Sequence, residues 1–185
     1  MASKLNVISS ALTLIGDLPL TSLSGTTRAH VVADNLYDNT VQMELSKFRW
    51  SFARKKAQLS LVAATPVGNE YDHMYELPSD MMFLIKLNPS INYQVINGQV
   101  YCNYSGSLFC DYSANVAESE WPAYFAKMVE YKLAMDFAPS IRDSAASMEL
   151  MAAQYDNASR MARYTDSQQS PITPLQSRPF IDVRF

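Results

Sequence analysis

The side chains that most often carry chemistry in proteins are few and scattered in this sequence. Its only histidines, His30 and His73, fall in different predicted elements, and its only cysteines are Cys102 and Cys110. This arrangement lacks the ligand spacing of a structural zinc site. The five glycines stand singly, so no glycine-rich loop is available to hold a phosphate group. We therefore expect no metal, no cofactor and no catalytic residue.

The nearest approach to an acid–base pair is the stretch Asp72-His73, with Glu76 close by. It falls in a predicted strand, where successive side chains point to opposite faces, so Asp72 and His73 should point apart. The chain also has no G-x-S-x-G motif that would mark a nucleophilic serine. A small hydrolase built around His73 is the weaker interpretation, and ordinary surface polar residues are the favoured one.

One basic and aromatic stretch could bind nucleic acid. It contains four cations and two large rings, namely Arg49, Trp50, Phe52, Arg54, Lys55 and Lys56. Cations neutralise phosphates and aromatic rings stack on bases, as in a DNA-binding groove. The whole chain, however, has a net charge of −3 and a pI near 5.3, so it does not attract a polyanion as a whole. We favour the end of a helix, where cations meet the helix dipole and their stems cover apolar neighbours.

These residues belong to a chain of 185 residues, the size of one domain or of one domain with an insertion. A hydrophobic fraction of 48% supplies a core, and 18% charged residues argue against general disorder. The N-terminal segment is amphipathic, so we expect no signal peptide, and no stretch approaches the length of a membrane span. We expect both cysteines to be reduced in a cytoplasm.

Apolar residues at helical spacing, with capping residues before them, predict four helices. The expected ranges are 5–15, ended by Gly16; from Thr26 or Thr27 to about 47; 119–138, capped by Ser119; and about 140–165. The third helix is apolar almost all round, so its own chain or another must cover it. Because the rest of the composition looks soluble, this combination suits assembly on a template, and we expect the isolated subunit to be largely monomeric.

Between the second and third predicted helices, apolar residues recur at every second position, which predicts an inserted β segment. The expected strands, after an alternation that starts at Ala57, are 71–76, 82–87, 93–96, 99–104 and 108–112. Asn97-Gly98 predicts a type I′ hairpin that pairs Val95 with Val100. For the next turn, a three-residue loop at 105–107 keeps one face wholly apolar, which predicts that Cys102 lies opposite Cys110.

The sequence thus predicts an α+β fold, a bundle of about four helices with an inserted antiparallel β subdomain and an extended C-terminal arm. The bundle takes residues 1–56 and 117–166, the β subdomain residues 57–116, and the arm residues 167–185. Three prolines keep the arm from forming a regular helix, yet its end is apolar. We expect it to dock on another chain through Arg178, Phe180, Ile181, Val183, Arg184 and Phe185.

Several stretches, read in order, resemble a phage protein family. They are ALTLIGDLPLTSL, LSKFRWSFARKKAQL, YDHMYELPSDMM and AAQYDNASRMARYTD. The small "L-G" plus "P-L-T-S-L" opening, the Trp-Ser-Phe-Ala at a helix end and the Tyr-x-Leu-Pro-x-Asp motif are similar to the tail tubular protein A family, the head–tail adaptors of short-tailed phages. The similarity covers most of the chain from Ala11 to Asp166.

This resemblance implies a structural virion protein without enzymatic activity. It implies a homo-oligomeric ring of twelve subunits between the portal protein and a tail nozzle protein of the tail tubular protein B type, with an axial channel through which DNA passes without sequence-specific binding. By resemblance, Trp50 and Phe52 are packing anchors where the second helix meets the β insertion, and the cations of 49–56 contact other subunits or the portal. The location implied is the virion head–tail interface, and the host cytoplasm during assembly. The rival hypothesis is a DNA-binding or genome-packaging-associated protein that uses the patch from Arg49 to Lys56.

Overall fold

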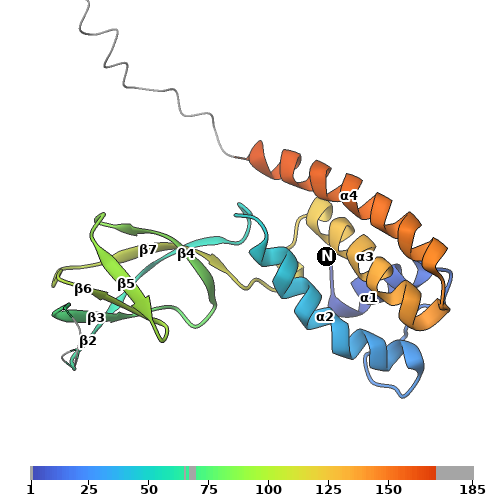
Figure 1. The fold of residues 1–185 in the computed structure, drawn as a ribbon, viewed down its shortest axis with the longest axis horizontal. Coiled ribbons are helices and arrows are strands. Elements are labelled where there is room, and N and C mark those ends of the chain that lie inside the picture. Colours follow the sequence, from blue (N-terminus) through green and yellow to red (C-terminus); the bar gives the residue numbers. More distant parts are fainter. Residues whose placement is uncertain (1, 65, 67–69, 170–185) are drawn as a thin grey trace, which may run out of the picture.

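The chain forms an elongated α+β structure, with a helical bundle at one end and two antiparallel sheets at the other (Figure 1). This computed structural model describes residues 2–64, 66 and 70–169. The predicted fold class, a helical bundle with an inserted antiparallel β subdomain, is confirmed. The C-terminal arm is not tested, because residues 170–185 lie outside the described residues.

The bundle contains four α-helices, with a 3₁₀ turn before the third and a π-helical turn after it. Their bounds are α1 (Lys4–Leu14), α2 (Arg28–Ser46), η1 (Glu118–Glu120), α3 (Ala123–Phe137), η2 (Ala138–Arg142) and α4 (Ala145–Ser167). Of the helices that the structure describes, none has both the length and the apolar composition to cross a membrane.

Helix α3 lies in the middle of the bundle and packs against α1, α2 and α4 (Figure 1). Its buried side chains include Phe125, Met128, Leu133 and Phe137. The chain's own helices therefore provide the cover that this apolar helix needs. The apolar character of α3 consequently gives no reason to expect assembly on a template.

The predicted ends of α1 agree with the structure, but the predicted starts of α3 and α4 do not. Ser3 accepts a hydrogen bond from the Asn6 N–H (3.2 Å), and α1 is followed by Gly16 at φ +76°, as predicted. The prediction that Ser119 caps α3 is wrong, because Ser119 lies inside η1 and the extended Pro122 precedes α3. The predicted start of α4 is also early, because η2 intervenes and Ser144 is the cap.

Two small sheets form the other end of the molecule. Sheet A has the order β1 (Arg54–Gln58), β7 (Phe109–Ala114), β4 (Met81–Asn88). Sheet B has the order β2 (Ser60–Val62), β3 (His73–Glu76), β6 (Gln99–Cys102), β5 (Tyr93–Ile96). The first strand begins three residues before the predicted boundary at residue 57.

The β5–β6 hairpin has the predicted register, with Val95 opposite Val100 across Asn97 and Gly98, both at positive φ. The predicted hairpin between β6 and β7 is wrong, because these strands belong to different sheets. Cys102 therefore lies opposite residues of β3 and β5, and Cys110 opposite residues of β1 and β4.

The connection between β6 and β7 is held by a residue far away in the sequence. The Tyr75 hydroxyl donates to the carbonyl oxygens of Tyr104 (2.9 Å) and Gly106 (2.7 Å). These contacts hold residues 103–108 as a crossing between sheets. One hydrophobic core continues from the bundle into both sheets, so Cys102 and Cys110 both remain buried.

Candidate interface at the junction of the bundle and the sheets

The polypeptide passes from the bundle to the sheets through residues 47–53, here called the junction segment. Helix α2 ends as the Lys47 N–H donates to the Met43 carbonyl oxygen (3.1 Å). A turn follows, in which the Ala53 N–H donates to the Trp50 carbonyl oxygen (3.3 Å). The Ala53 carbonyl oxygen in turn accepts from the Ala114 N–H (2.8 Å), which fastens the segment to β7.

Trp50 anchors the junction segment in the core, where it is only 2% exposed. Its ring centroid lies 5.1 Å from those of Phe48 and Phe125 and 6.0 Å from that of Phe52. The indole N–H donates to the Glu44 carbonyl oxygen (3.0 Å). Such aromatic contacts add about 0.5–1.5 kcal/mol each to the burial of apolar area. Trp50 is therefore a packing residue here and is covered from any nucleic-acid base.

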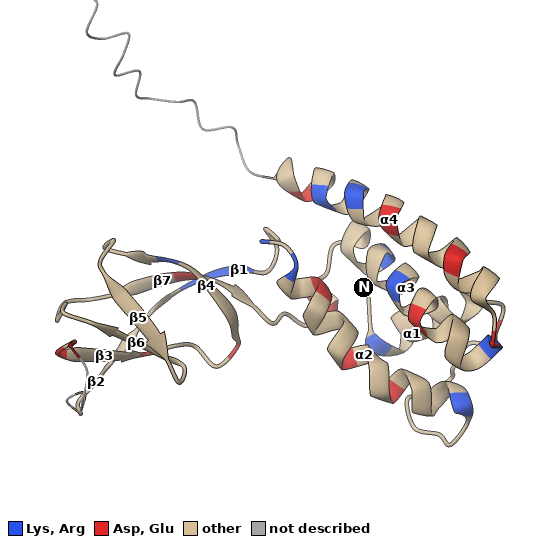
Figure 2. Cartoon of the chain, in the orientation of Figure 1, with Lys and Arg blue, Asp and Glu red and all other residues tan. Residues whose placement is uncertain are grey.

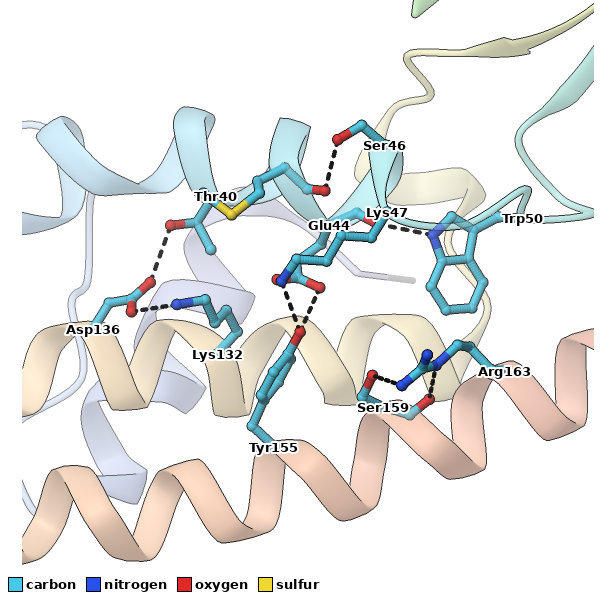
Figure 3. A network of polar contacts seen from close by, with 11 residues as sticks. Thr40, Glu44, Ser46, Lys47, Trp50, Lys132, Asp136, Tyr155, Ser159 and Arg163 are labelled. Atoms are coloured by element: carbon cyan, nitrogen blue, oxygen red, sulfur yellow. Dashed lines mark hydrogen bonds and ion pairs between the residues drawn. The ribbon is translucent and has the colours of Figure 1, made fainter. Parts of the chain in front are cut away.

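A buried carboxylate ties α2 to α4 near this junction (Figure 3). Glu44 is 1% exposed, and its Oε2 accepts from the Tyr155 hydroxyl (2.9 Å). Its Oε1 accepts from the Lys47 ammonium group (2.6 Å), which also donates to the Tyr155 oxygen (3.0 Å). Burial works to lower the pKa of Lys47, but the hydrogen bonds outweigh it and the pKa is raised. Lys47 is thus a structural cation of the bundle.

A second buried carboxylate, Asp166 on the last turn of α4, joins three elements. It is 3% exposed and accepts from both the backbone N–H (3.0 Å) and the hydroxyl (2.7 Å) of Ser51. It also accepts from the Tyr124 hydroxyl of α3 (2.8 Å). Burial first, and then the hydrogen bond to Asp166, raise the pKa of Tyr124 to about 12. This contact sets where the junction segment lies on the bundle.

The cations between residues 49 and 56 do not form one patch at the end of a helix, so the helix-end interpretation is wrong for most of them. Arg54, Lys55 and Lys56 belong to β1. Because side chains alternate along a strand, Arg54 and Lys56 share one face of sheet A and Lys55 lies on the other. Arg49 stays in the junction segment and is exposed. In Figure 2 these cations lie along β1 and the adjoining connection.

The outer face of sheet A is built in rows across its three strands. Lys56, Asp111 and Lys86 form one row across β1, β7 and β4. The Asp111 side chain is 2% exposed and is held by ion pairs with Arg54 and, at 3.8 Å, with Lys86. Burial works to raise the pKa of Asp111, but Arg54 and the neighbouring ammonium groups hold it below its ordinary value. This face therefore carries three cations around one carboxylate.

Two oxygen atoms of this face have no hydrogen-bond partner within the described part of the chain: Oδ1 of Asp111 and Oγ of Ser113. A hollow of about 420 Å³ opens over the same row and is lined by Lys56, Lys86, Asn88, Phe109, Cys110 and Asp111. Lys56 makes no hydrogen bond or ion pair with any residue that the structure describes. We call this hollow, with Lys56 and Lys86 at its sides, the basic hollow.

The opposite face of sheet A carries a different ion pair, between Lys55 and Asp80 (3.1 Å). The Asp80 carboxylate also accepts from the Tyr112 hydroxyl (3.1 Å). The Asp80 carbonyl oxygen accepts from the Asn115 N–H (2.8 Å). Burial first, and then Asp80, raise the pKa of Tyr112 to about 12. Asp80 thus holds the loop before β4 against β1 and β7.

The two histidines lie in different elements and have different neighbours. His30 Nδ1 lies 2.6 Å from the Thr27 hydroxyl at the start of α2. His73 lies on β3, opposite Cys102. Across residues 2–64, 66 and 70–169, no group of three His, Cys, Asp or Glu side chains could hold a metal ion.

The structure brings Trp50 and Phe52 together in the core and places Arg54 and Lys56 around Asp111. The expected docking residues of the arm, from Arg178 to Phe185, lie outside the described residues. Sequence reasoning missed Asp166 as a contact residue. Asp166 could have been recognised from its position four residues after Ala162, on the apolar face of α4. A carboxylate on a buried face needs hydrogen-bond donors from neighbouring elements.

No protein family and no curated protein matches this chain.

Proposed function

We propose that this protein is a structural virion protein, a head–tail adaptor that forms a ring between the portal and the tail nozzle protein. One observation carries the proposal. Two of the motifs that resemble the adaptor family, LSKFRWSFARKKAQL and YDHMYELPSDMM, meet in space through the Lys55–Asp80 ion pair (3.1 Å). Motifs that are weak separately therefore belong to one structural unit, the junction between the bundle and sheet A.

In this proposal the protein binds its neighbours in the virion and catalyses no reaction. A ring of twelve subunits would leave an axial channel, through which DNA moves without base readout. The cations of the junction and of β1 would contact other subunits or the portal, because Trp50 is covered and cannot stack on bases. The protein would reside at the head–tail interface of the virion and in the host cytoplasm during assembly.

Attachment to portal-bearing heads tests this function. Purified heads that carry a portal but lack this protein are mixed with the full chain and viewed by negative-stain electron microscopy. We expect extra ring density under the portal. A chain truncated after residue 169 should fold with nearly the same free energy of unfolding but fail to attach. If the full chain adds no density to portal-bearing heads, the proposal is wrong. If the truncation unfolds the subunit, the arm belongs to the subunit's own core.

The second candidate function is DNA binding, which the exposed cations Arg49, Lys56 and Lys86 favour. A protein that neutralises phosphates loses affinity steeply as salt concentration rises. A salt titration of binding to duplex DNA therefore separates the two functions. Tight binding at low salt with a steep salt slope supports DNA binding, and a shallow slope with weak binding supports the adaptor.

A further inference from the structure

We propose that the basic hollow of one subunit binds the acidic face of α2 and η1 on a second copy of this chain. This inference deepens the proposed ring and rests on it. It names the surfaces through which neighbouring subunits recognise each other, and it predicts a head-to-tail contact between two different patches.

The basic side of this contact has three cations around the single Asp111 carboxylate, so it carries a net positive charge. Asp111 is held by Arg54 and Lys86, and the Lys86 side chain is still 63% exposed. Lys56, in the same row across the sheet, has no ion pair with any described residue. Beside the two ammonium groups the Phe109 ring is 43% exposed. Two cations next to an uncovered ring suit a protein surface with carboxylates and some apolar area.

The acidic side lies on other elements. A hollow of about 390 Å³ separates α2 from the segment after β7, and its lining includes Asp38 and Glu118. Asp34 is exposed one turn before Asp38 on α2, and Glu120 is exposed on η1. The Asp38 side chain is 68% exposed, although Lys4 approaches it at 2.9 Å. We call these four carboxylates the acidic face.

Figure 2 shows Lys and Arg along β1, and Asp and Glu along α2 after its first residue, Arg28. The patches of one subunit are thus different surfaces, and they complement each other in charge. A contact between two different patches is heterologous, and such contacts generate closed rings when the rotation between subunits closes. A twofold dimer would instead need one patch that complements itself.

A second copy suits the basic hollow better than a phosphate does. The Phe109 ring beside the two ammonium groups is 43% exposed and can find apolar contact on a protein surface, whereas a phosphate offers none.

Charge reversal tests the contact on the full-length protein. Self-association is measured by sedimentation velocity up to millimolar concentration at low salt, for the wild type, for Lys56→Glu with Lys86→Glu, and for Asp34→Lys with Asp38→Lys. We expect the wild type to be largely monomeric at micromolar concentration and to associate only towards millimolar concentration, and each variant alone to associate at least tenfold more weakly. An equimolar mixture of the two variants should recover association, because the reversed basic hollow then faces the reversed acidic face.

A matched control for Asp34→Lys with Asp38→Lys is Glu149→Lys with Asp156→Lys, which makes the same change of net charge on exposed positions of α4. This control should associate at least as well as the wild type. Lys56→Gln with Lys86→Gln, which adds no charge beside Asp111, should also weaken association if the Glu variant folds poorly. Circular dichroism establishes folding of every variant.

A wild type that stays monomeric, or a mixture that fails to recover association, overturns the inference. So does a result in which the Lys56 and Lys86 variants lose binding to duplex DNA but keep self-association. Attachment of these variants to portal-bearing heads is scored separately. A wild type that attaches to portal-bearing heads but does not self-associate would leave the adaptor function standing without this interface, which distinguishes the two failures.

Discussion

Removal of the Asp166 carboxylate should loosen the junction between the bundle and the sheets. Asp166 is 3% exposed and accepts hydrogen bonds from the Ser51 N–H, the Ser51 hydroxyl and the Tyr124 hydroxyl. Hydrogen bonds to a charged group contribute about 1.5–3 kcal/mol each, and a buried donor left without its acceptor costs about 1–3 kcal/mol. Ser51 and Tyr124 are only half-buried, so water can replace part of the loss. We therefore expect Asp166→Ala to lower the free energy of unfolding by about 3 kcal/mol.

Asp166→Asn is the finer probe of the same contact. The retained Oδ1 can still accept from the Tyr124 and Ser51 hydroxyl groups, but an NH₂ group would face the Ser51 N–H. One donor then meets another, so we expect a smaller loss of about 1–2 kcal/mol. Asp156→Ala, on an exposed face of the same helix, should change stability by less than about 0.5 kcal/mol.

The assay is urea-induced unfolding followed by tryptophan fluorescence, because Trp50 lies in the junction. A double-mutant cycle of Asp166→Ala with Tyr124→Phe isolates the Tyr124 contact, and it should show a coupling energy of about 1 kcal/mol or more. If Asp166→Ala and Asp156→Ala destabilise the protein equally, or if the cycle shows no coupling, then Asp166 does not hold the junction and the reasoning is refuted.

Three further predictions concern the core and sheet A. Trp50→Ala should lower the free energy of unfolding in urea by about 3–5 kcal/mol, because it leaves a cavity among aromatic rings and an unpaired Glu44 carbonyl oxygen. Cys102 and Cys110 are buried, and burial raises the pKa of Cys110, so a thiol reagent should label both only as fast as the protein unfolds; rapid labelling of native protein would contradict this. The pKa of Asp111 lies below its ordinary value near 3.8, so its ion pairs stabilise the protein above that pH. This stabilisation is lost as the pH falls through the folded-state pKa. The free energy of unfolding of Asp111→Asn should therefore depend less on pH in the acid range than that of the wild type.

Local patterns predicted the elements well because they depend on neighbouring residues. The helical spacing of apolar residues located four helices, and Asn97-Gly98 predicted the register of the β5–β6 hairpin. Positive φ at both turn residues is a local requirement, so it could be read from two letters of sequence. The wrong cap at Ser119 and the early predicted start of α4 near residue 140 were local errors as well, and they arose because short 3₁₀ and π-helical turns flank α3.

The path from β6 to β7 could not be predicted, because it depends on contacts distant in sequence. A three-residue loop kept the predicted faces apolar, which made a hairpin plausible. The actual crossing depends on Tyr75, whose hydroxyl donates to carbonyl oxygens of residues 104 and 106 from another strand. Both pairings bury Cys102 and Cys110, so hydrophobic pattern alone could not distinguish them.

The basic stretch from Arg49 to Lys56 shows why the order of residues matters more than their composition. Read as composition, it resembles a DNA-binding groove. In the strand β1, side chains alternate between the two faces, so Lys55 pairs with Asp80 on one face and Arg54 pairs with Asp111 on the other. Trp50 is buried in the core. What is left exposed is a smaller surface, Arg49 and Lys56 with Lys86 beside them. A surface of this size is small for a DNA groove but sufficient for a contact between subunits, because charge complementarity of a few residues can select a partner without holding a polyanion.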